Sequence, residues 1–348
     1  MENKTINKSM WTFPLATRFV NEHRIPMPVN NEELFWYHIN MFDKEFDTIN
    51  KWNALIEDIH RYFDGNPQAF VEGFLDVREN VINSVKENPA YIKFNNMDMN
   101  KYAVDKNKYK QRARNIYNEG NIGTHLISID LRKANFQAMN YVDKEIMFNS
   151  DNYHQLITKF TDIPLIVNSK YFRQVFFGQL NPSRVFTVET YMVYQILDYI
   201  HKVLPFKFEI NSINADEIVL SYDPYEYCKD AMTALTNNEI LTLLPNDILR
   251  DLGIEVHIEF FTLEGYNFYS NKRNRKHFTF YAKNFTTLPA SDKFINTELM
   301  CVNGQFYSLT YKLFHNLPLC EEDYHFVNCD VDCIFNDTFR IEKIENKK

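Results

Sequence analysis

The sequence predicts an α+β fold in which helices cover one face of an antiparallel sheet, with a helical N-terminal region before it. Residues 31–88 carry apolar side chains at helical spacing. An apolar run that ends in an acid, at 125–130, is typical of a strand, and two apolar runs that flank an acidic pair, at 208–220, are typical of a hairpin. Helical and strand-like segments then interleave to about residue 283, which favours an α+β class.

The N-terminal third predicts about three helices. Asn31 followed by two glutamates is a typical helix start. Two further helices are expected over 48–62 and 68–86, the second with phenylalanines and valines on one face. We therefore divide the chain into a helical N-terminal region (1–100), a central domain (101–290) and a small C-terminal region (291–348).

The central domain mixes both kinds of element. Helices are expected over 153–161, 168–177, 183–203, 223–237 and 245–252. Strands are expected over 255–262, 266–269 and 277–283, in addition to the two acid-bearing segments.

Composition limits the class of protein. The chain has 348 residues, of which 45% are hydrophobic, and a net charge of −8, which does not favour nucleic-acid binding by the chain as a whole. No apolar run reaches the length of a membrane span, so no membrane partner is expected. Five cysteines, an odd number, argue against a disulfide framework and favour a reducing, cytoplasmic setting.

Three acids stand at the ends of predicted strands. Asp130 follows the apolar run 125–129, and Asp216 and Glu217 lie at the tip of the predicted hairpin. If the strands are neighbours, the carboxylates would repel one another unless a divalent cation neutralised them. Such a set is the donor chemistry of two-metal phosphoryl transfer, so we expect Asp130 and Asp216 to bind Mg²⁺ or Mn²⁺. The plainer interpretations are a helix cap for Asp130 and a turn for the acidic pair.

A basic segment precedes the first acid. Its cations are interleaved with Tyr102 and Tyr109, and they are Lys101, Lys106, Lys108, Lys110, Arg112 and Arg114. Either a solvated helix face or a phosphate-contacting surface fits this pattern, and both interpretations stay open.

Segments of this chain resemble the palm of right-hand nucleic-acid polymerases, most closely reverse transcriptases. The first family motif reads Asp-Leu-x-x-Ala-Phe-Phe, and Asp130, Leu131, Ala134 and Phe136 match it. The family's hairpin motif, Tyr-x-Asp-Asp, is similar to the segment 214–217, Asn-Ala-Asp-Glu.

A third motif lies between these two. Residues 178–186, Gly-Gln-Leu-Asn-Pro-Ser-Arg-Val-Phe, are similar to the family's Gly-x-x-Asn-Ser-Pro-x-x-Phe segment. The resemblance covers about 109–283. Family B DNA polymerases look similar more loosely, through Arg275-Lys276 before a strand.

The resemblance implies a palm-like sheet and a template-directed polymerase, a reverse transcriptase-like nucleotidyltransferase that acts on a primer, a template and nucleoside triphosphates. It implies that Asp130, Asp216 and Glu217 are the catalytic acids. The residues it implies for nucleotide binding are Arg132, Lys133, Asn135, Phe136, Gly178, Gln179 and Arg184. Those expected to contact nucleic acid are Lys108, Lys110, Arg112, Arg114, Arg275 and Lys276.

Departures from the family pattern leave two alternatives. Asn135 stands where the family has its aromatic sugar gate, Asn214 replaces the motif tyrosine, and Glu217 replaces an aspartate. These changes leave sugar selection open and favour a catalytically inactive palm-fold protein that binds nucleic acid or assembles with a partner. Ala215-Asp216-Glu217-Ile218 is also similar to the Gly-Gly-Asp-Glu-Phe hairpin of nucleotidyl cyclases.

A second metal candidate lies near the C-terminus. Cys320, His325, Cys329 and Cys333 supply four nitrogen or sulfur donors within fourteen residues, enough for a tetrahedral zinc site. Their spacing is not one of the common zinc patterns, and free buried cysteines are an equally ordinary interpretation.

Overall fold

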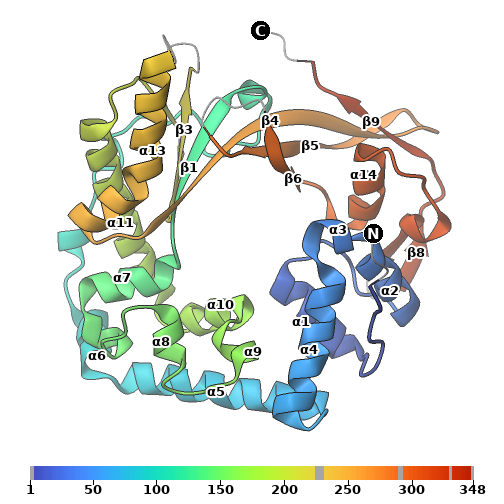
Figure 1. Cartoon of the computed structure of the whole chain (residues 1–348), viewed down its shortest axis with the longest axis horizontal. Coiled ribbons are helices and arrows are strands. Elements are labelled where there is room, and N and C mark those ends of the chain that lie inside the picture. The colour runs from blue at the N-terminus through green and yellow to red at the C-terminus, as the bar shows by residue number, and fades with distance from the viewer. Residues whose placement is uncertain (1–3, 224–230, 289–292, 329–330, 346–348) are drawn as a thin grey trace.

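The computed structural model describes residues 4–223, 231–288, 293–328 and 331–345. In Figure 1 the chain runs round a ring, from the N-terminal helices through α5 to α7 and α11, and then back across the sheet. In the part of the chain so described, no helix combines the length and apolarity needed to cross a membrane.

Helices make up much of the described chain, and the sequence explains where the main ones begin. The Asn31 side chain accepts a hydrogen bond from the Leu34 N–H at 2.9 Å and caps α2. Asn66 caps α5, with Pro67 at its first position. The helices are α1 (Phe13–His23), α2 (Glu32–Met41), α3 (Asp43–Phe46), α4 (Thr48–Phe63), α5 (Pro67–Glu87), α6 (Pro89–Asn96), α7 (Ala134–Val142), α8 (Tyr153–Ile157), α9 (Pro164–Val167), α10 (Lys170–Gly178), α11 (Pro182–Val203), α13 (Ala231–Leu252) and α14 (Tyr307–Phe314).

One open sheet joins strands from the middle and the end of the chain. Its order is β2-β3-β1-β4-β5-β6, with β9 paired to β4, and every ladder between these strands is antiparallel. The strands are β1 (His125–Leu131), β2 (Glu209–Ile213), β3 (Glu217–Tyr222), β4 (Val256–Ser270), β5 (Arg275–Thr286), β6 (Phe294–Met300) and β9 (Phe339–Lys343), while β7 (His325–Asn328) and β8 (Val331–Ile334) form a separate hairpin. The α+β class with an antiparallel open sheet is therefore confirmed.

The alternation of β1 gives the sheet two different faces. Ile127, Ile129 and Leu131 are buried in the main core, together with the apolar residues of α7, α11 and α13. Ser128 and Asp130 point to the other face, which we call the acid face. There the register places Glu217 of β3 and Glu259 of β4 as their neighbours. The helices pack behind this part of the sheet and leave the acid face on the opposite side (Figure 1).

Two sequence predictions need correction. The helices expected over 223–237 and 245–252 form one helix in the described chain, α13, which continues through Pro245; residues 224–230 of the first prediction lie outside the described residues. A proline costs a helix one hydrogen bond, but the buried side chains of Leu241, Leu244 and Ile248 keep both halves on the core.

The two strands expected over 255–262 and 266–269 are likewise one strand, β4. Gly265 is not a turn residue. A Cβ at that position would lie 2.5 Å from a side-chain carbon of Ile122, so the glycine allows a neighbouring segment to approach the strand closely.

A second core lies at the far end of the β4–β5 hairpin. It joins the N-terminal helices to α14 and β9, and Phe35, Trp52, Phe268 and Phe280 are fully buried in it. Residues from the two ends of the chain thus pack on one hydrophobic centre, which closes the ring seen in Figure 1.

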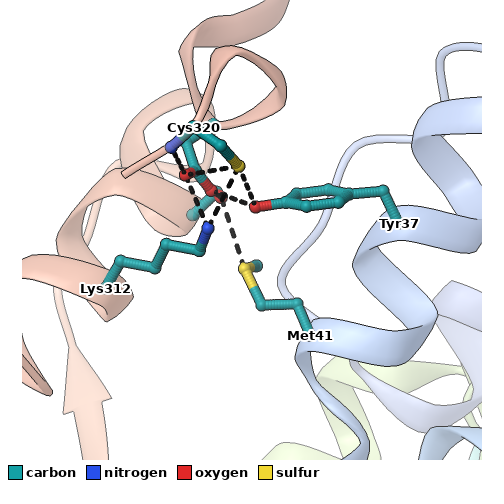
Figure 2. A network of polar contacts seen from close by, with 6 residues as sticks. Tyr37, Met41, Lys312 and Cys320 are labelled. Carbon is teal, nitrogen blue, oxygen red and sulfur yellow. Dashed lines mark hydrogen bonds and ion pairs between the residues drawn. The ribbon is translucent and has the colours of Figure 1, made fainter. Parts of the chain in front are cut away.

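A buried polar network fastens α2 to the C-terminal part of this core (Figure 2). The Asp323 carboxylate accepts hydrogen bonds from Tyr37 Oη (2.7 Å), Ser308 Oγ (2.6 Å) and Lys312 Nζ (2.7 Å). The Cys320 N–H donates a fourth bond (2.8 Å). Burial raises the pKa of Asp323, but these donors outweigh it and the pKa lies below its ordinary value. The carboxylate is therefore charged and paired.

Candidate active site

The structure brings the three predicted acids to one place. Asp130 lies directly opposite Glu217 in the β1–β3 ladder. Residues opposite each other in such a ladder have Cα atoms about 4.5–5.5 Å apart. The Leu131 N–H donates to the Asp216 carbonyl at 2.8 Å, so Asp216 in the turn flanks the end of β1. The acids expected to act together are thus neighbours in space, although eighty-five residues separate Asp130 from Asp216.

The helix-cap interpretation of Asp130 is wrong. The N-cap of α7 is Lys133, and no side chain caps that helix. Lys133 has a positive φ of 48°, which turns the chain sharply from β1 into α7. Asp130 is left half-buried at the rim of the sheet.

Hydrogen bonds fix two further carboxylates, Glu217 beside Asp130 and Glu189 near Asp216. Ser128 Oγ donates to Glu217 Oε1 at 2.6 Å, and this bond holds Glu217 over the acid face. On the helical side, Asn135 of α7 donates its amide N–H to Glu189 of α11. Glu189 is only 5% exposed, and it lies within electrostatic range of Asp216. The charges of Asp216, Glu217 and Glu259 therefore act on Asp130, and Glu189 interacts with Asp216 from the helical side.

This crowding raises two pKa values. Burial, and then the charges of Asp216 and Glu217, raise the pKa of Asp130 to about 7. Burial and the charge of Asp216 raise the pKa of Glu189 to about 7, although the bond from Asn135 opposes the shift. The folded site holds negative charge at a free-energy cost, which a bound cation would offset.

A cationic side chain of α10, that of Lys170, lies within electrostatic range of Asp130. Lys170 is half-buried, and its charge lowers the pKa of Asp130 against the effect of the surrounding acids. The Glu22 carboxylate accepts the Lys170 backbone N–H at 2.6 Å and so anchors the start of α10. Arg173 on the same helix and Lys133 both lie over the ring of Tyr153, at 5.5 and 5.9 Å from its centroid. Positive side chains are therefore gathered near the negative site.

The raised pKa values predict how stability depends on pH. The folded state binds protons more tightly than the unfolded chain at Asp130 and Glu189, whose ordinary values are 3.8 and 4.5. Their contribution to the free energy of unfolding should therefore fall as the pH rises from about 4 to about 7, and stay level above. In EDTA, the free energy of unfolding of Asp130→Asn/Glu189→Gln, measured relative to that of the wild type, should increase by about 1 kcal/mol between pH 5 and pH 7.5. This figure is reduced because solvent partly screens the charges. Urea unfolding at the two pH values measures this, and parallel curves for both proteins would contradict it.

The donor chemistry of the site fits Mg²⁺ or Mn²⁺, because carboxylate oxygens are the ligands these ions prefer. Across the described ranges, however, no three His, Cys, Asp or Glu side chains converge closely enough to form a ready ion-binding group. Asp216 stands next to Glu217, the ladder partner of Asp130, and the Glu217 side chain is directed towards Ser128.

The other predicted site residues lie at several distances from the acids. Arg132 forms an exposed ion pair with Glu255 (3.1 Å) at the same end of β1. Phe136 is 3% exposed and belongs to the main core. Arg184 donates through Nη1 to the carbonyls of Phe94 and Met97, so it ties α11 to the end of α6.

Gly178 ends α10, and Gln179 is exposed in the turn before α11. A Cβ on Gly178 would meet no atom within 4 Å, so the glycine borders open space.

The predicted nucleic-acid contacts do not gather at the acids. Lys108, Lys110 and Arg112 lie beside β2 and the end of α11, in a groove described below. Arg114 is exposed in the same segment. Arg275 and Lys276 begin β5, where Arg275 pairs with Ser270, thirteen residues along β4 from His257, the partner of Asp130. At about 3.3 Å per residue, that separation is roughly 40 Å.

The candidate zinc ligands are engaged separately. Cys320 contacts Tyr37 and Lys312, and His325 Nδ1 lies 2.9 Å from Asp332 Oδ2. In the β7–β8 register His325 faces Ile334 and Cys333 faces Phe326, so the histidine and Cys333 point to opposite faces. Cys329 lies outside the described residues.

Sequence reasoning missed Ser128, Glu189, Glu259 and Lys170. Ser128 is two residues before Asp130, and strand alternation alone would have placed it on the same face. Glu189 occupies a position in the apolar stripe of α11, four residues from both Val185 and Val193, and an acid in such a stripe is a signal. Glu259 and Lys170 carry no local signal, because only the sheet register and the packing of α10 bring them near.

No protein-family model, curated protein or solved structure matches this chain.

Proposed function

We propose that the chain is a nucleotidyltransferase that extends the 3′-end of a nucleic acid on a template, in the manner of the reverse transcriptase-like palm that its motifs resemble. The observation that carries the proposal is the position of Asp130, opposite Glu217 and beside Asp216, on the sheet face away from the helices. An antiparallel sheet that presents acids on one face and packs helices on the other suits this chemistry. We propose in addition that the protein works in a reducing, cytoplasmic setting, which its odd number of cysteines favours.

Asp130 and Asp216 would hold the divalent ions. When bound, such ions align the attacking hydroxyl with the α-phosphate and neutralise the charge that develops on its oxygens. The raised pKa of Asp130 supports a cation at this place, because a positive charge would relieve the repulsion from Asp216 and Glu217. Ser128 keeps Glu217 at the edge of the same site.

The chain's own cations would bind the triphosphate. Lys170, at the anchored start of α10, lies within electrostatic range of Asp130, and Arg173 and Lys133 lie over Tyr153. A polyanion between Lys170 and the acid-bound ions would meet positive charge on both sides. Asn135, at the position that the resemblance gives to the sugar, is oriented by its bond to Glu189.

The alternative is a palm-like protein that binds nucleic acid or a partner without catalysis. Two observations favour it. In the described parts of the chain no three donors converge into an ion-binding group, and Arg184, which the resemblance implies for nucleotide binding, is committed to backbone carbonyls.

Primer extension tests the proposal. A 5′-labelled primer on a longer template should be extended with Mg²⁺ or Mn²⁺, and EDTA should stop the reaction. Asp216→Asn should lower the rate by about 10²–10³-fold, since it removes an acid needed to hold the ions. Asp76→Asn, the same change at an exposed position on α5, should retain the wild-type rate.

The outcomes separate the hypotheses. Absence of extension with either metal and with either ribo- or deoxyribonucleotides would remove the proposal in favour of the non-catalytic alternative. A cyclic product from ATP or GTP alone would identify a nucleotidyl cyclase instead.

A further inference from the structure

A large cavity lies at the opposite end of β1 from Asp130. It has a volume of about 900 Å³ and lies between the start of β1, the loop after α11 and the ends of β2 and β3. A second cavity of about 440 Å³ shares Arg112, His201, Phe208 and Glu209 with it and extends along the basic segment. We call the two together the basic groove.

The groove is separate from the acid face. His125 lines it and begins β1, and Asp130 follows five residues later on the same strand. At about 3.3 Å per residue the two positions are roughly 17 Å apart. A ligand bound beside His125 therefore does not contact Asp130.

The charge of the groove is opposite to that of the chain. Its lining holds four cationic side chains, Lys108, Lys110, Arg112 and Lys207, and two acidic ones, Glu209 and Asp223, whereas the whole chain has a net charge of −8. Two of these cations have acidic partners: Arg112 contacts Glu209 at 3.2 Å, and Lys108 contacts Asp198 at 2.5 Å. Both cationic side chains are about half exposed, so these ion pairs are weak. Positive charge concentrated on one surface of an acidic protein favours a polyanionic ligand.

Aromatic rings line the same groove. Tyr109 stacks on His201, with ring centroids 4.8 Å apart and planes at 4°, and His201 also lies 4.8 Å from Phe208. Phe206 and Tyr222 continue the aromatic lining further along. Rings interleaved with cations are the usual surface for stacked bases and their phosphates.

The backbone keeps this surface in place. The N–H groups of Arg112 and Ala113 donate to the carbonyls of Ile210 and Asn211 at 3.0 Å, so the basic segment runs beside β2 in a fixed register. Gln111 Oε1 accepts the Ile213 N–H at 3.0 Å and adds a further attachment. Backbone hydrogen bonds to β2 thus hold the basic segment in place before a ligand binds. This order lowers the conformational entropy that the segment loses on binding.

We propose that the basic groove binds single-stranded nucleic acid, with the backbone along Lys108, Lys110, Arg112 and Lys207 and bases against the Tyr109–His201–Phe208 rings. A duplex is excluded as the ligand because its base faces are already stacked and cannot meet these rings. A lone nucleotide would use only part of a lining that extends over two cavities. The assignment does not depend on catalysis at the acids.

Fluorescence anisotropy with a labelled single-stranded DNA 12-mer, in EDTA and 50 mM salt, tests the assignment on the full chain. The wild type should bind, and Arg112→Glu/Lys207→Glu should weaken binding about tenfold or more and flatten the salt dependence. His201→Ala should weaken binding about tenfold through lost stacking. Lys86→Glu/Lys93→Glu, with the same charge change on exposed positions of α5 and α6, should bind as the wild type does.

Photo-crosslinking fixes the location. A 12-mer containing 4-thiothymidine should crosslink to peptides from 105–112 or 199–209. Crosslinks confined to other segments would overturn the assignment, as would equal binding by Arg112→Glu/Lys207→Glu and its control. Competition by 1 mM ATP as strong as by unlabelled oligonucleotide, or equal affinity for a duplex of the same length, would overturn it too. If the reversed variant melts at a lower temperature than the control, Arg112→Ala/Lys207→Ala replaces it.

Discussion

Asp130→Asn is expected to lower nucleotide incorporation by about 10³-fold, while the protein itself becomes more stable in EDTA. The loss follows because the amide cannot hold a divalent ion between β1 and the β2–β3 turn. The gain follows because Asp130 is half-buried beside Asp216 and Glu217, whose charges raise its pKa to about 7. At pH 7.5 the neutral side chain removes that repulsion, which we expect to raise the Tm by roughly 2–4 °C.

The two readouts together distinguish a site from a structural acid. A structural aspartate would lose stability on replacement, because its hydrogen bonds would be lost. Primer extension and thermal unfolding of the same preparations, with Asp76→Asn as the matched control, measure both effects. Incorporation within twofold of the wild type, or a lowered Tm in EDTA, would show that Asp130 does not serve as proposed.

Asp323→Ala is expected to lower the free energy of unfolding by about 3–5 kcal/mol, the usual cost of removing one partner from a buried ion pair. The Asp323 side chain is 0% exposed and that of Lys312 is 11% exposed. The alanine would leave the ammonium of Lys312, the hydroxyls of Tyr37 and Ser308, and the Cys320 N–H without their shared acceptor (Figure 2). Chemical denaturation of purified variants measures the loss.

A double variant separates two contributions to this loss, the unpaired charge of Lys312 and the packing lost with the Asp323 side chain. Asp323→Ala/Lys312→Met removes the unpaired ammonium and should recover part of the loss. Lys343→Met breaks the exposed pair with Glu264, whose Nζ–Oε1 distance is 2.6 Å, and should cost less than about 1 kcal/mol. A double variant less stable than Asp323→Ala alone would contradict this account of the network.

Local patterns in the sequence predicted a good part of the fold. The apolar run before Asp130 predicted β1, and the cap at Asn31 and the spacing in 48–62 and 68–86 predicted α2, α4 and α5. These elements follow from side-chain periodicity and end signals, which depend on residues close together in the chain. The errors at Pro245 and Gly265 arose where burial outweighed a local breaker.

Sequence by itself determined which acids end the strands, because strand alternation and turn preference depend on residues that are close together in the chain. Tertiary structure alone decided which side chains meet them. The ladder register set Glu217 and Glu259 beside β1, and the packing of α11 brought Glu189 near Asp216. The packing of α10 placed Lys170 within electrostatic range of Asp130. The tertiary structure also places the basic segment beside β2, away from the acids. Contacts between residues distant in the chain depend on how whole elements pack, and no local pattern records that packing.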